Sequence, residues 1–209
     1  KSIVSTVMAN KICEANDIEM VEVLTGFKFI GEKIKELDEG GDMHFIFGFE
    51  ESIGFMAGTY ARDKDAVFAA MLLAEVACYY KSKGMSMYDA LINLYETYGY
   101  FIENTESAVF EGFDSAERRE AVMSSIRSNP PKELGLEVES IKDYLAGVPG
   151  FTKSNVLFYN LSDGCAVAIR PSGTEPKVKS YVMAQGSTRA EAEANKAAIR
   201  SAVDKILKA

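Results

Sequence analysis

Strand-like and helix-like hydrophobic patterns alternate along the first hundred residues of this 209-residue chain. Short runs with β-branched residues at 2–6 and 20–24 predict two strands, and the interval 7–16 between them predicts a helix. Residues 29–37 carry a second helical pattern, and the aromatic stretch 43–49 predicts a third strand. Because strands that alternate with helices usually pair in parallel, we expect an α/β domain with a mostly parallel sheet.

The most apolar segment of the chain is "AVFAAMLLAEVACYYKSKG" at residues 66–84, which predicts a helix packed on this sheet. Asp65 precedes the segment as a plausible N-cap, and Gly84 is placed to end the helix. Ser86, followed three residues later by Asp89, resembles a capping box and predicts the start of a further helix.

The pattern changes after Ile102, so we divide the chain into domains at 1–102 and 103–209. The second domain has strand candidates at 105–112, 155–161, 165–170 and 177–184, and helical patterns at 115–129 and 187–208. Ser187 is a candidate cap for the last helix. Strands separated by short polar turns favour an α+β domain with an antiparallel sheet.

Composition narrows the class of protein. The net charge of −8 argues against a nucleic-acid or anionic-membrane surface as the main partner, because such surfaces require a broad basic field. Three widely spaced cysteines form neither a metal motif nor a disulfide framework, which indicates a reduced, cytoplasmic protein. The chain begins without methionine and runs at once into a strand-like segment, so we expect a piece of a longer protein.

A dense group of anion-binding side chains occupies the turn in "RPSGTEPKVKSY", residues 170–181. Pro171 restricts the backbone and Gly173 permits positive φ, so successive N–H groups can turn inward as an anion nest. The side chains add donors that suit phosphate, namely those of Arg170, Ser172, Thr174 and either Lys177 or Lys179. An ordinary polar hairpin turn explains the same composition, and the segment is not a P-loop.

The stretch "GFEESIG", residues 48–54, follows the predicted third strand, where open α/β sheets bind ligands. Glu50 and Ser52 point to the same side in an extended chain and form a pair suited to sugar hydroxyls, with Glu51 opposite. A solvated loop is the alternative. Lys64 lies just before the apolar helix and is either a site residue or an exposed ion-pair partner of the aspartates beside it.

Four motifs in this order, "TGFKFIG", "GFEESIG", "RDKDA" and "RPSGTEPKVKSY", resemble the α-D-phosphohexomutase family, which includes phosphoglucomutases and phosphomannomutases. The resemblance covers essentially the whole chain and implies the third and fourth of four domains, the third incomplete at its N-terminus. It implies sugar binding by Glu50 and Ser52, and an active-site role for Lys64. It also implies phosphate binding by Arg170, Ser172, Gly173 and Thr174, to which we add Lys179 for its charge beside the loop.

The family's reaction moves a phosphoryl group between C1 and C6 of a hexose through a bisphosphorylated sugar. The resemblance therefore implies a phosphorylated hexose as partner, hexose 1,6-bisphosphate as intermediate and Mg²⁺ as cofactor of the longer protein. Neither a "TASHNP"-like serine loop nor a "DGDGDR"-like metal loop occurs here, so we expect this chain alone to be inactive. A phosphopentomutase, a phosphoglucosamine mutase and a non-catalytic phosphosugar-binding module remain alternatives.

Overall fold

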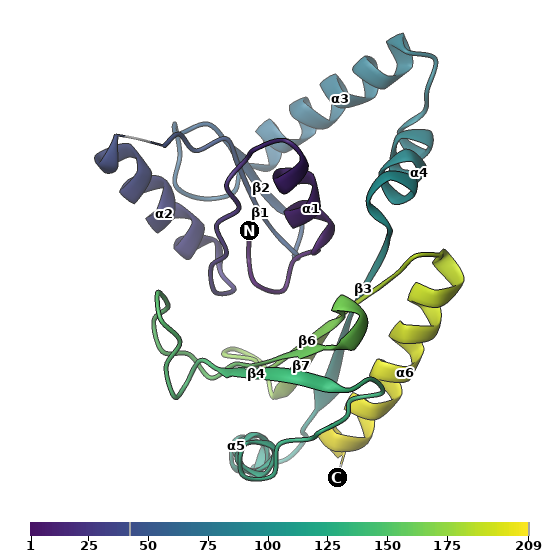
Figure 1. The fold of residues 1–209 in the computed structure, drawn as a ribbon. Coiled ribbons are helices and arrows are strands. Elements are labelled where there is room, and N and C mark those ends of the chain that lie inside the picture. Colours follow the sequence, from purple (N-terminus) through teal and green to yellow (C-terminus); the bar gives the residue numbers. More distant parts are fainter. Residues whose placement is uncertain (42, 209) are drawn as a thin grey trace. The chain divides into compact units, whose positions relative to one another are not determined.

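The computed structural model describes residues 1–41 and 43–208, and the chain forms two compact units, Lys1–Tyr98 and Gly99–Ala209. Figure 1 shows the first unit in purple to teal and the second in teal to yellow. The predicted domain boundary after Ile102 lies inside strand β3 (Tyr100–Val109), which belongs to the second unit.

The named strands of the first unit form an antiparallel hairpin, β1 (Phe47–Glu50) with β2 (Gly54–Ala57). The prediction of strands at 2–6 and 20–24 is wrong in extent. These two segments pair with each other at a single position, a parallel bridge between Ser2 and Val23. The chain turns directly after the bridge, where Ser5 N–H donates to the Ser2 carbonyl. The expectation of a mostly parallel sheet therefore fails for the named strands, although the mixed α/β class is correct.

Among its described residues, the first unit also has four helices: α1 (Met8–Ala15), α2 (Phe27–Gly40), α3 (Ala66–Ser82) and α4 (Met87–Tyr98). The cap predicted for α3 is confirmed, since the Asp65 carboxylate accepts hydrogen bonds from two N–H groups of the first turn. The capping box of α4 is also confirmed, because Ser86 and Asp89 bond to each other's backbone N–H groups.

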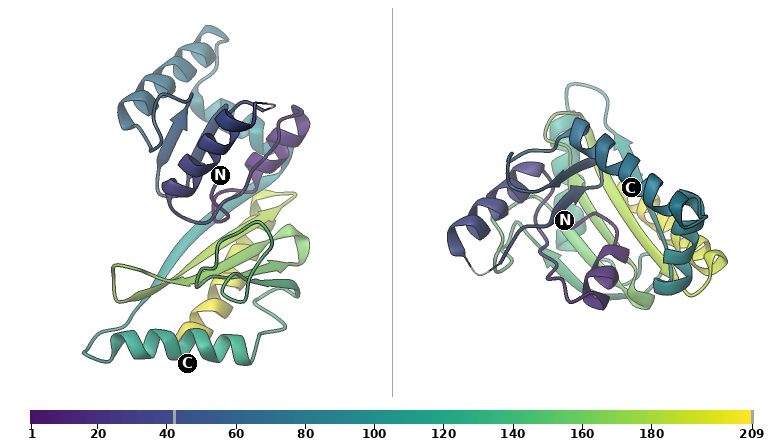
Figure 2. Two further views of the ribbon diagram at one scale, coloured as in Figure 1. Left: turned by 90° about the vertical axis from the view of Figure 1, so that its left-hand side faces the viewer. Right: turned by 90° about the horizontal axis from the view of Figure 1, so that it is seen from above.

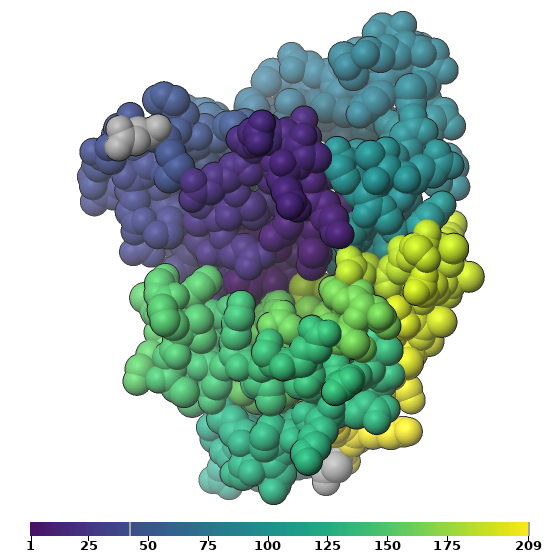
Figure 3. Space-filling model, in the orientation of Figure 1, coloured from purple at the N-terminus to yellow at the C-terminus, as the bar shows by residue number. Residues whose placement is uncertain are grey.

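Helix α3 is far more exposed than its apolar sequence predicts. It contacts β2 and α4, yet none of its residues is buried, and the Val67 side chain is 82% exposed. Figure 3 shows this helix at the surface, in blue in the upper part of the view. The core of the unit forms instead around α2, where Phe27, Ile30 and Ile34 pack with Met56.

The second unit is built on a five-stranded antiparallel sheet in the order β3-β7-β6-β5-β4. Its further strands are β4 (Val138–Asp143), β5 (Leu157–Leu161), β6 (Ala166–Pro171) and β7 (Lys177–Gly186). The strands predicted at 155–161, 165–170 and 177–184 are confirmed as β5, β6 and β7, whereas the strand predicted at 105–112 is observed as β3, which begins earlier at Tyr100 and ends at Val109. Strand β4 was not predicted, because it is an edge strand whose sequence "VESIKD" is largely polar and exposed.

Helices α5 (Ser115–Ser128) and α6 (Arg189–Lys208) lie on one face of this sheet, as the left view of Figure 2 shows. Side chains from both helices form the core with alternate residues of the strands. The short 3-10 helix η1 (Ser162–Gly164) joins β5 to β6. The N-cap of α6 is Thr188 rather than the predicted Ser187, because the Thr188 hydroxyl accepts from Glu191 N–H. Within the described part of the chain, no helix is both long enough and apolar enough to span a membrane.

Candidate functional site

Two groups of candidate residues lie on the two units, and each group is built around a hairpin. The first lies at the turn between β1 and β2. Glu50 ends β1 with only 6% of the residue exposed, and its Oε1 atom accepts a hydrogen bond of 2.9 Å from the Ser52 hydroxyl. The structure thus brings together the two residues predicted to read sugar hydroxyls. Glu50 retains its Oε2 atom, and the Ser52 oxygen retains acceptor capacity, for a ligand.

Lys64 extends to the same carboxylate, with Nζ 3.7 Å from Glu50 Oε1 and 3.5 Å from Asp63 Oδ1. Gly54, which pairs with Glu50 across the hairpin, makes this approach possible. A β-carbon at Gly54 would lie 2.8 Å from Lys64 Cδ and 3.0 Å from Glu50 Cγ, closer than packed side chains tolerate. The glycine therefore keeps the space in which the lysine and the carboxylate meet.

The opposite side of the turn is anchored to the interior. Glu51 Oε2 accepts a 2.8 Å hydrogen bond from the Ser2 hydroxyl, which is buried and lies 2.8 Å from the Ser5 hydroxyl. Ile53 closes the turn at φ 61°, in the left-handed region that β-branched residues avoid, and its side chain is exposed. Sequence reasoning missed the Ser2–Glu51 contact, because 49 residues separate its partners.

The second group lies at the turn between β6 and β7, residues 172–176. Ser172 N–H donates to the Lys177 carbonyl at 2.8 Å and closes the hairpin. The Ser172 hydroxyl oxygen accepts from Glu175 N–H at 3.3 Å, which leaves the hydroxyl proton for another acceptor. Within residues 1–41 and 43–208, the N–H groups of Gly173 and Thr174 have no hydrogen-bond acceptor.

Gly173 does not have the positive φ that the sequence suggested, and that detail of the predicted anion nest is wrong. The turn is closed by hydrogen bonds at its two ends and needs no left-handed residue at this position. An added β-carbon at Gly173 would meet no atom within 4 Å, so the residue is not required for packing. The space beside the Gly173 α-carbon is therefore open.

Two cations lie side by side at the base of this turn. Arg170 and Lys179 are direct partners across β6 and β7, and neither forms an ion pair within 4 Å among the described residues, although the charge of Lys179 adds to that of Lys177 in lowering the pKa of the Glu175 carboxyl. Lys177, the other lysine considered, forms an ion pair of 2.6 Å with Glu175 and holds the pKa of that carboxyl below its usual value. Like charges directly opposite in a sheet are destabilising, so an unpaired Arg–Lys pair is typical of an anion site.

Arg119 on α5 also contacts the turn. Its Nη1 atom donates to the carbonyl oxygens of Ser172 at 2.9 Å and Glu175 at 3.0 Å. Sequence reasoning missed this residue as well, because "SAERREAV" carries no local signal and its partners lie more than fifty residues away.

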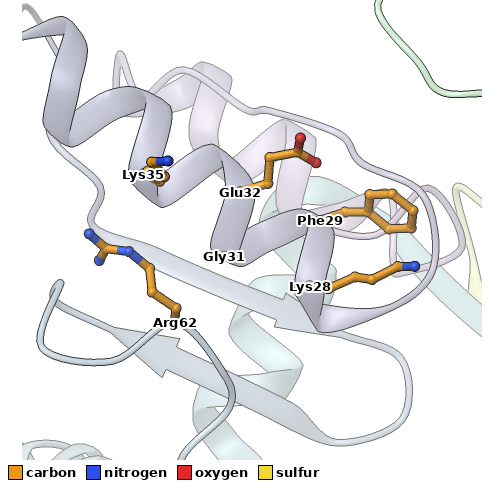
Figure 4. Close-up of a pocket in the computed structure, with 6 residues that line it drawn as sticks. All are labelled: Lys28, Phe29, Gly31, Glu32, Lys35 and Arg62. Carbon is orange, nitrogen blue, oxygen red and sulfur yellow. The ribbon is translucent and has the colours of Figure 1, made fainter.

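A shallow hollow of about 490 Å³ lies on the first unit beside α2. It is lined by Lys28, Phe29, Gly31, Glu32, Lys35 and Arg62 (Figure 4). Figure 4 shows Lys28 and Arg62 pointing away from each other. Arg62 is ion-paired with Asp38 and donates to the Thr59 carbonyl at 2.9 Å, so the cations do not converge on one ligand position.

Two family models match the chain. One, described as "Phosphoglucomutase/phosphomannomutase, alpha/beta/alpha domain III", matches residues 1–98, and the C-terminal domain of the same family matches residues 125–202. The chain belongs to the phosphoglucomutase/phosphomannomutase family. This confirms the resemblance inferred from the four motifs and the fold class that it implied.

Similar proteins include the phosphoglucomutases of Staphylococcus aureus strains USA300 and COL. Each is 40% identical over 194 residues, which cover 87% of this chain and 35% of the relative. The chain thus spans about a third of the length of these curated relatives. A solved structure of pp63/parafusin, a phosphoglucomutase from Paramecium in its open form, matches with a TM-score of 0.72. It is 19% identical, covers 99% of this chain and 37% of the solved one, and supports the fold alone.

The family resemblance implies Mg²⁺, and the described residues do not fit such an ion. No group of three or more His, Cys, Asp or Glu side chains within them is arranged to hold a metal. The acidic residues of the β1–β2 turn already have partners, since Glu50 accepts from Ser52 and lies near Lys64, and Glu51 accepts from Ser2.

Proposed function

We propose that this chain is the substrate-binding C-terminal part of a phosphoglucomutase or phosphomannomutase. The longer protein would interconvert hexose 1-phosphate and hexose 6-phosphate through a bisphosphorylated sugar. Family membership supports the reaction class, and the naming of its relatives as phosphoglucomutases favours a glucose phosphate. The observation that carries the binding role is the unpaired Arg170–Lys179 pair beside two free N–H groups.

The phosphate end of the substrate binds the turn of the second unit. Arg170 offers two parallel N–H donors to two phosphate oxygens, and Lys179 supplies a second charge beside it. The Gly173 and Thr174 N–H groups and the Ser172 and Thr174 hydroxyls are the remaining donors. Each hydrogen bond to a charged group contributes roughly 1.5–3 kcal/mol, so four or five of them dominate the affinity. This turn holds the phosphate that is not being transferred.

The sugar end binds the turn of the first unit. One carboxylate accepts hydrogen bonds from two neighbouring hydroxyls, and Glu50 is held in place by Ser52 and Lys64 before the sugar arrives. The bisphosphorylated sugar must react in two orientations. Its central hydroxyls therefore need a binding residue that can form hydrogen bonds with them in either orientation. A carboxylate with a flexible hydroxyl beside it meets this requirement.

Lys64 is the residue of this chain that we assign to the reacting region. Its side chain is half exposed and its ammonium group lies 3.7 Å from the Glu50 carboxylate, so it can donate to a substrate oxygen there. Positioning and charge stabilisation are what a protein contributes to phosphoryl transfer, and the assigned residues supply both. The phosphoryl donor and the implied Mg²⁺ are assigned to other domains of the parent protein.

Calorimetric titration of the chain with inorganic phosphate and with glucose 1-phosphate tests the proposal. We expect both to bind, and Arg170→Ala to weaken both by about two orders of magnitude, since two charge-assisted hydrogen bonds are lost. Lys153→Ala is the matched control, because Lys153 is exposed and outside the turn. Equal losses for the two variants would refute the phosphate site.

Two further variants separate the parts of the proposal. Glu50→Gln is expected to weaken glucose 1-phosphate and leave inorganic phosphate unchanged, because only the sugar meets Glu50. Gly173→Ala is expected to keep the free energy of unfolding and weaken both ligands, since its β-carbon meets only open space in the free protein. Titration with mannose, glucosamine and pentose phosphates then ranks the substrate alternatives.

A further inference from the structure

Arg119 is the one side chain outside the β6–β7 turn that bonds its backbone, among the residues that the structure describes. One guanidinium nitrogen donates to two carbonyl oxygens of the turn, those of Ser172 and Glu175, at 2.9 and 3.0 Å. Its Nε atom donates to the Ser115 carbonyl of its own helix at 3.3 Å, which restricts the side chain. The guanidinium is thus fixed at both ends, between helix α5 and the turn.

The orientation of these carbonyls decides where the neighbouring N–H groups point. In a trans peptide the C=O and the following N–H lie in one plane and point in opposite directions. The Ser172 carbonyl faces Arg119, so the Gly173 N–H faces away from it, toward the open side of the turn. The peptide after Glu175 has no N–H, because the next residue is Pro176. Arg119 therefore acts on the N–H groups through the Ser172–Gly173 peptide.

The contact also changes the strength of the Gly173 donor. A cation on the carbonyl side polarises the peptide and increases the partial positive charge on its N–H. Neighbouring Arg118 provides a contrast, because it has the same charge and lies on the same helix. Its guanidinium lies over the Phe110 ring and, among the described residues, donates a hydrogen bond to the Glu111 carbonyl alone, at 3.5 Å.

We infer that Arg119 is a positioning residue for the phosphate site, which holds the Ser172–Gly173 peptide with its N–H toward the anion. This inference rests on the proposed function of the turn. Arg119 itself does not contact the phosphate. Its guanidinium donates to two carbonyl oxygens of the turn instead. Arg119 acts by holding the turn in its binding conformation before the ligand arrives.

The test compares Arg119→Met with Arg118→Met, which remove the same charge from the same helix and keep much of the apolar stem. Inorganic phosphate is the probe, titrated into the ¹⁵N-labelled chain while the Gly173 amide resonance is followed. We expect Arg119→Met to raise the Kd about tenfold, as loss of a supporting contact typically does, and Arg118→Met to raise it less than about twofold. The phosphate-induced shift of the Gly173 N–H is expected to shrink only in Arg119→Met.

Thermal unfolding without phosphate shows whether each variant is folded. If Arg119→Met does not fold, Arg119→Lys replaces it, because a lysine keeps the charge on a shorter stem. We expect the lysine of this variant to donate to only one of the two carbonyl oxygens, and the Kd for inorganic phosphate to rise about threefold. An unchanged Kd in the variant that folds, or equal losses for the Arg118 and Arg119 variants, overturns the inference.

Arg170→Ala in the same titration separates this inference from the proposed function. A large loss in Arg170→Ala with no loss in the Arg119 variants refutes only the positioning role. An unchanged Kd in Arg170→Ala refutes the phosphate site, and the positioning role with it.

Discussion

Reversing the charge of Lys179 should stabilise the second unit and abolish its phosphate binding. Lys179 on β7 lies directly opposite Arg170 on β6, so the native sheet carries two like charges in one cross-strand position. Lys179→Glu replaces that repulsion with an attractive pair. Cross-strand charge pairs contribute roughly 0.2–1 kcal/mol, and both side chains are only partly buried, so we expect a gain of about 0.5 kcal/mol in the free energy of unfolding.

Added phosphate should reverse the order of stability. A ligand that binds only the folded state at about ten times its Kd stabilises that state by about 1.4 kcal/mol. The native chain gains this stabilisation, and the variant, with a carboxylate at the site, gains none. Lys179→Glu is thus expected to be the more stable protein without phosphate and the less stable one with it.

Urea unfolding of both proteins, with and without phosphate at constant ionic strength, measures the four free energies. Lys153→Glu is the control for net charge, because it makes the same change at an exposed position outside the turn. It should respond to phosphate as the native chain does. A destabilised Lys179→Glu variant, or one that phosphate still stabilises, would show that the Arg170–Lys179 pair is not kept for anion binding.

Three other changes test the structure away from the proposed phosphate site. Tyr159→Phe should raise the free energy of unfolding by about 1 kcal/mol, since the buried hydroxyl has no partner among the described residues. Burial raises the pKa of Tyr159 to about 12 from the ordinary 10.0, so native stability should fall as pH rises through this window, and less so in the variant. Ile53→Gly should stabilise by about 1 kcal/mol in thermal unfolding, because it relieves a left-handed β-branched residue. Gly31→Ala should cost about 2 kcal/mol, since its β-carbon would lie 2.4 Å from the Arg62 carbonyl oxygen, and an unchanged melting temperature would contradict the packing of α2.

Sequence patterns predicted the second unit better than the first. Strands β5, β6 and β7 alternate apolar and polar residues over a one-sided core, which is the pattern that periodicity detects. In the first unit, residues 2–6 and 20–24 have strand-like composition and yet pair at one position only. Pairing depends on which partner is present, and composition does not report that.

The candidate site shows the same division. Glu50 and Ser52 are two residues apart, and side chains at this spacing in an extended chain point to the same side. The sequence therefore predicted that they would lie close together, and the structure shows a hydrogen bond between them. Arg119 and Ser2 support the two turns from more than forty residues away in the chain. No local pattern marks such residues, because their role depends on tertiary proximity.

The charges of the two turns match the two chemical parts of a phosphosugar. At the β6–β7 turn Lys177 pairs with Glu175, whereas Arg170 and Lys179 form no ion pair among the described residues, and two like charges in one cross-strand position are costly to the folded protein unless a multivalent anion neutralises them. In the β1–β2 turn the carboxylate of Glu50 already has a lysine and a hydroxyl beside it, so a second anion would gain little there. A neutral polyol would bind this turn more favourably than an anion, because its hydroxyls can donate hydrogen bonds to the Glu50 carboxylate without displacing Lys64. A phosphate at the first turn would have to compete with Glu50, and this asymmetry supports the proposal that the second unit binds the phosphate and the first unit binds the hydroxyls.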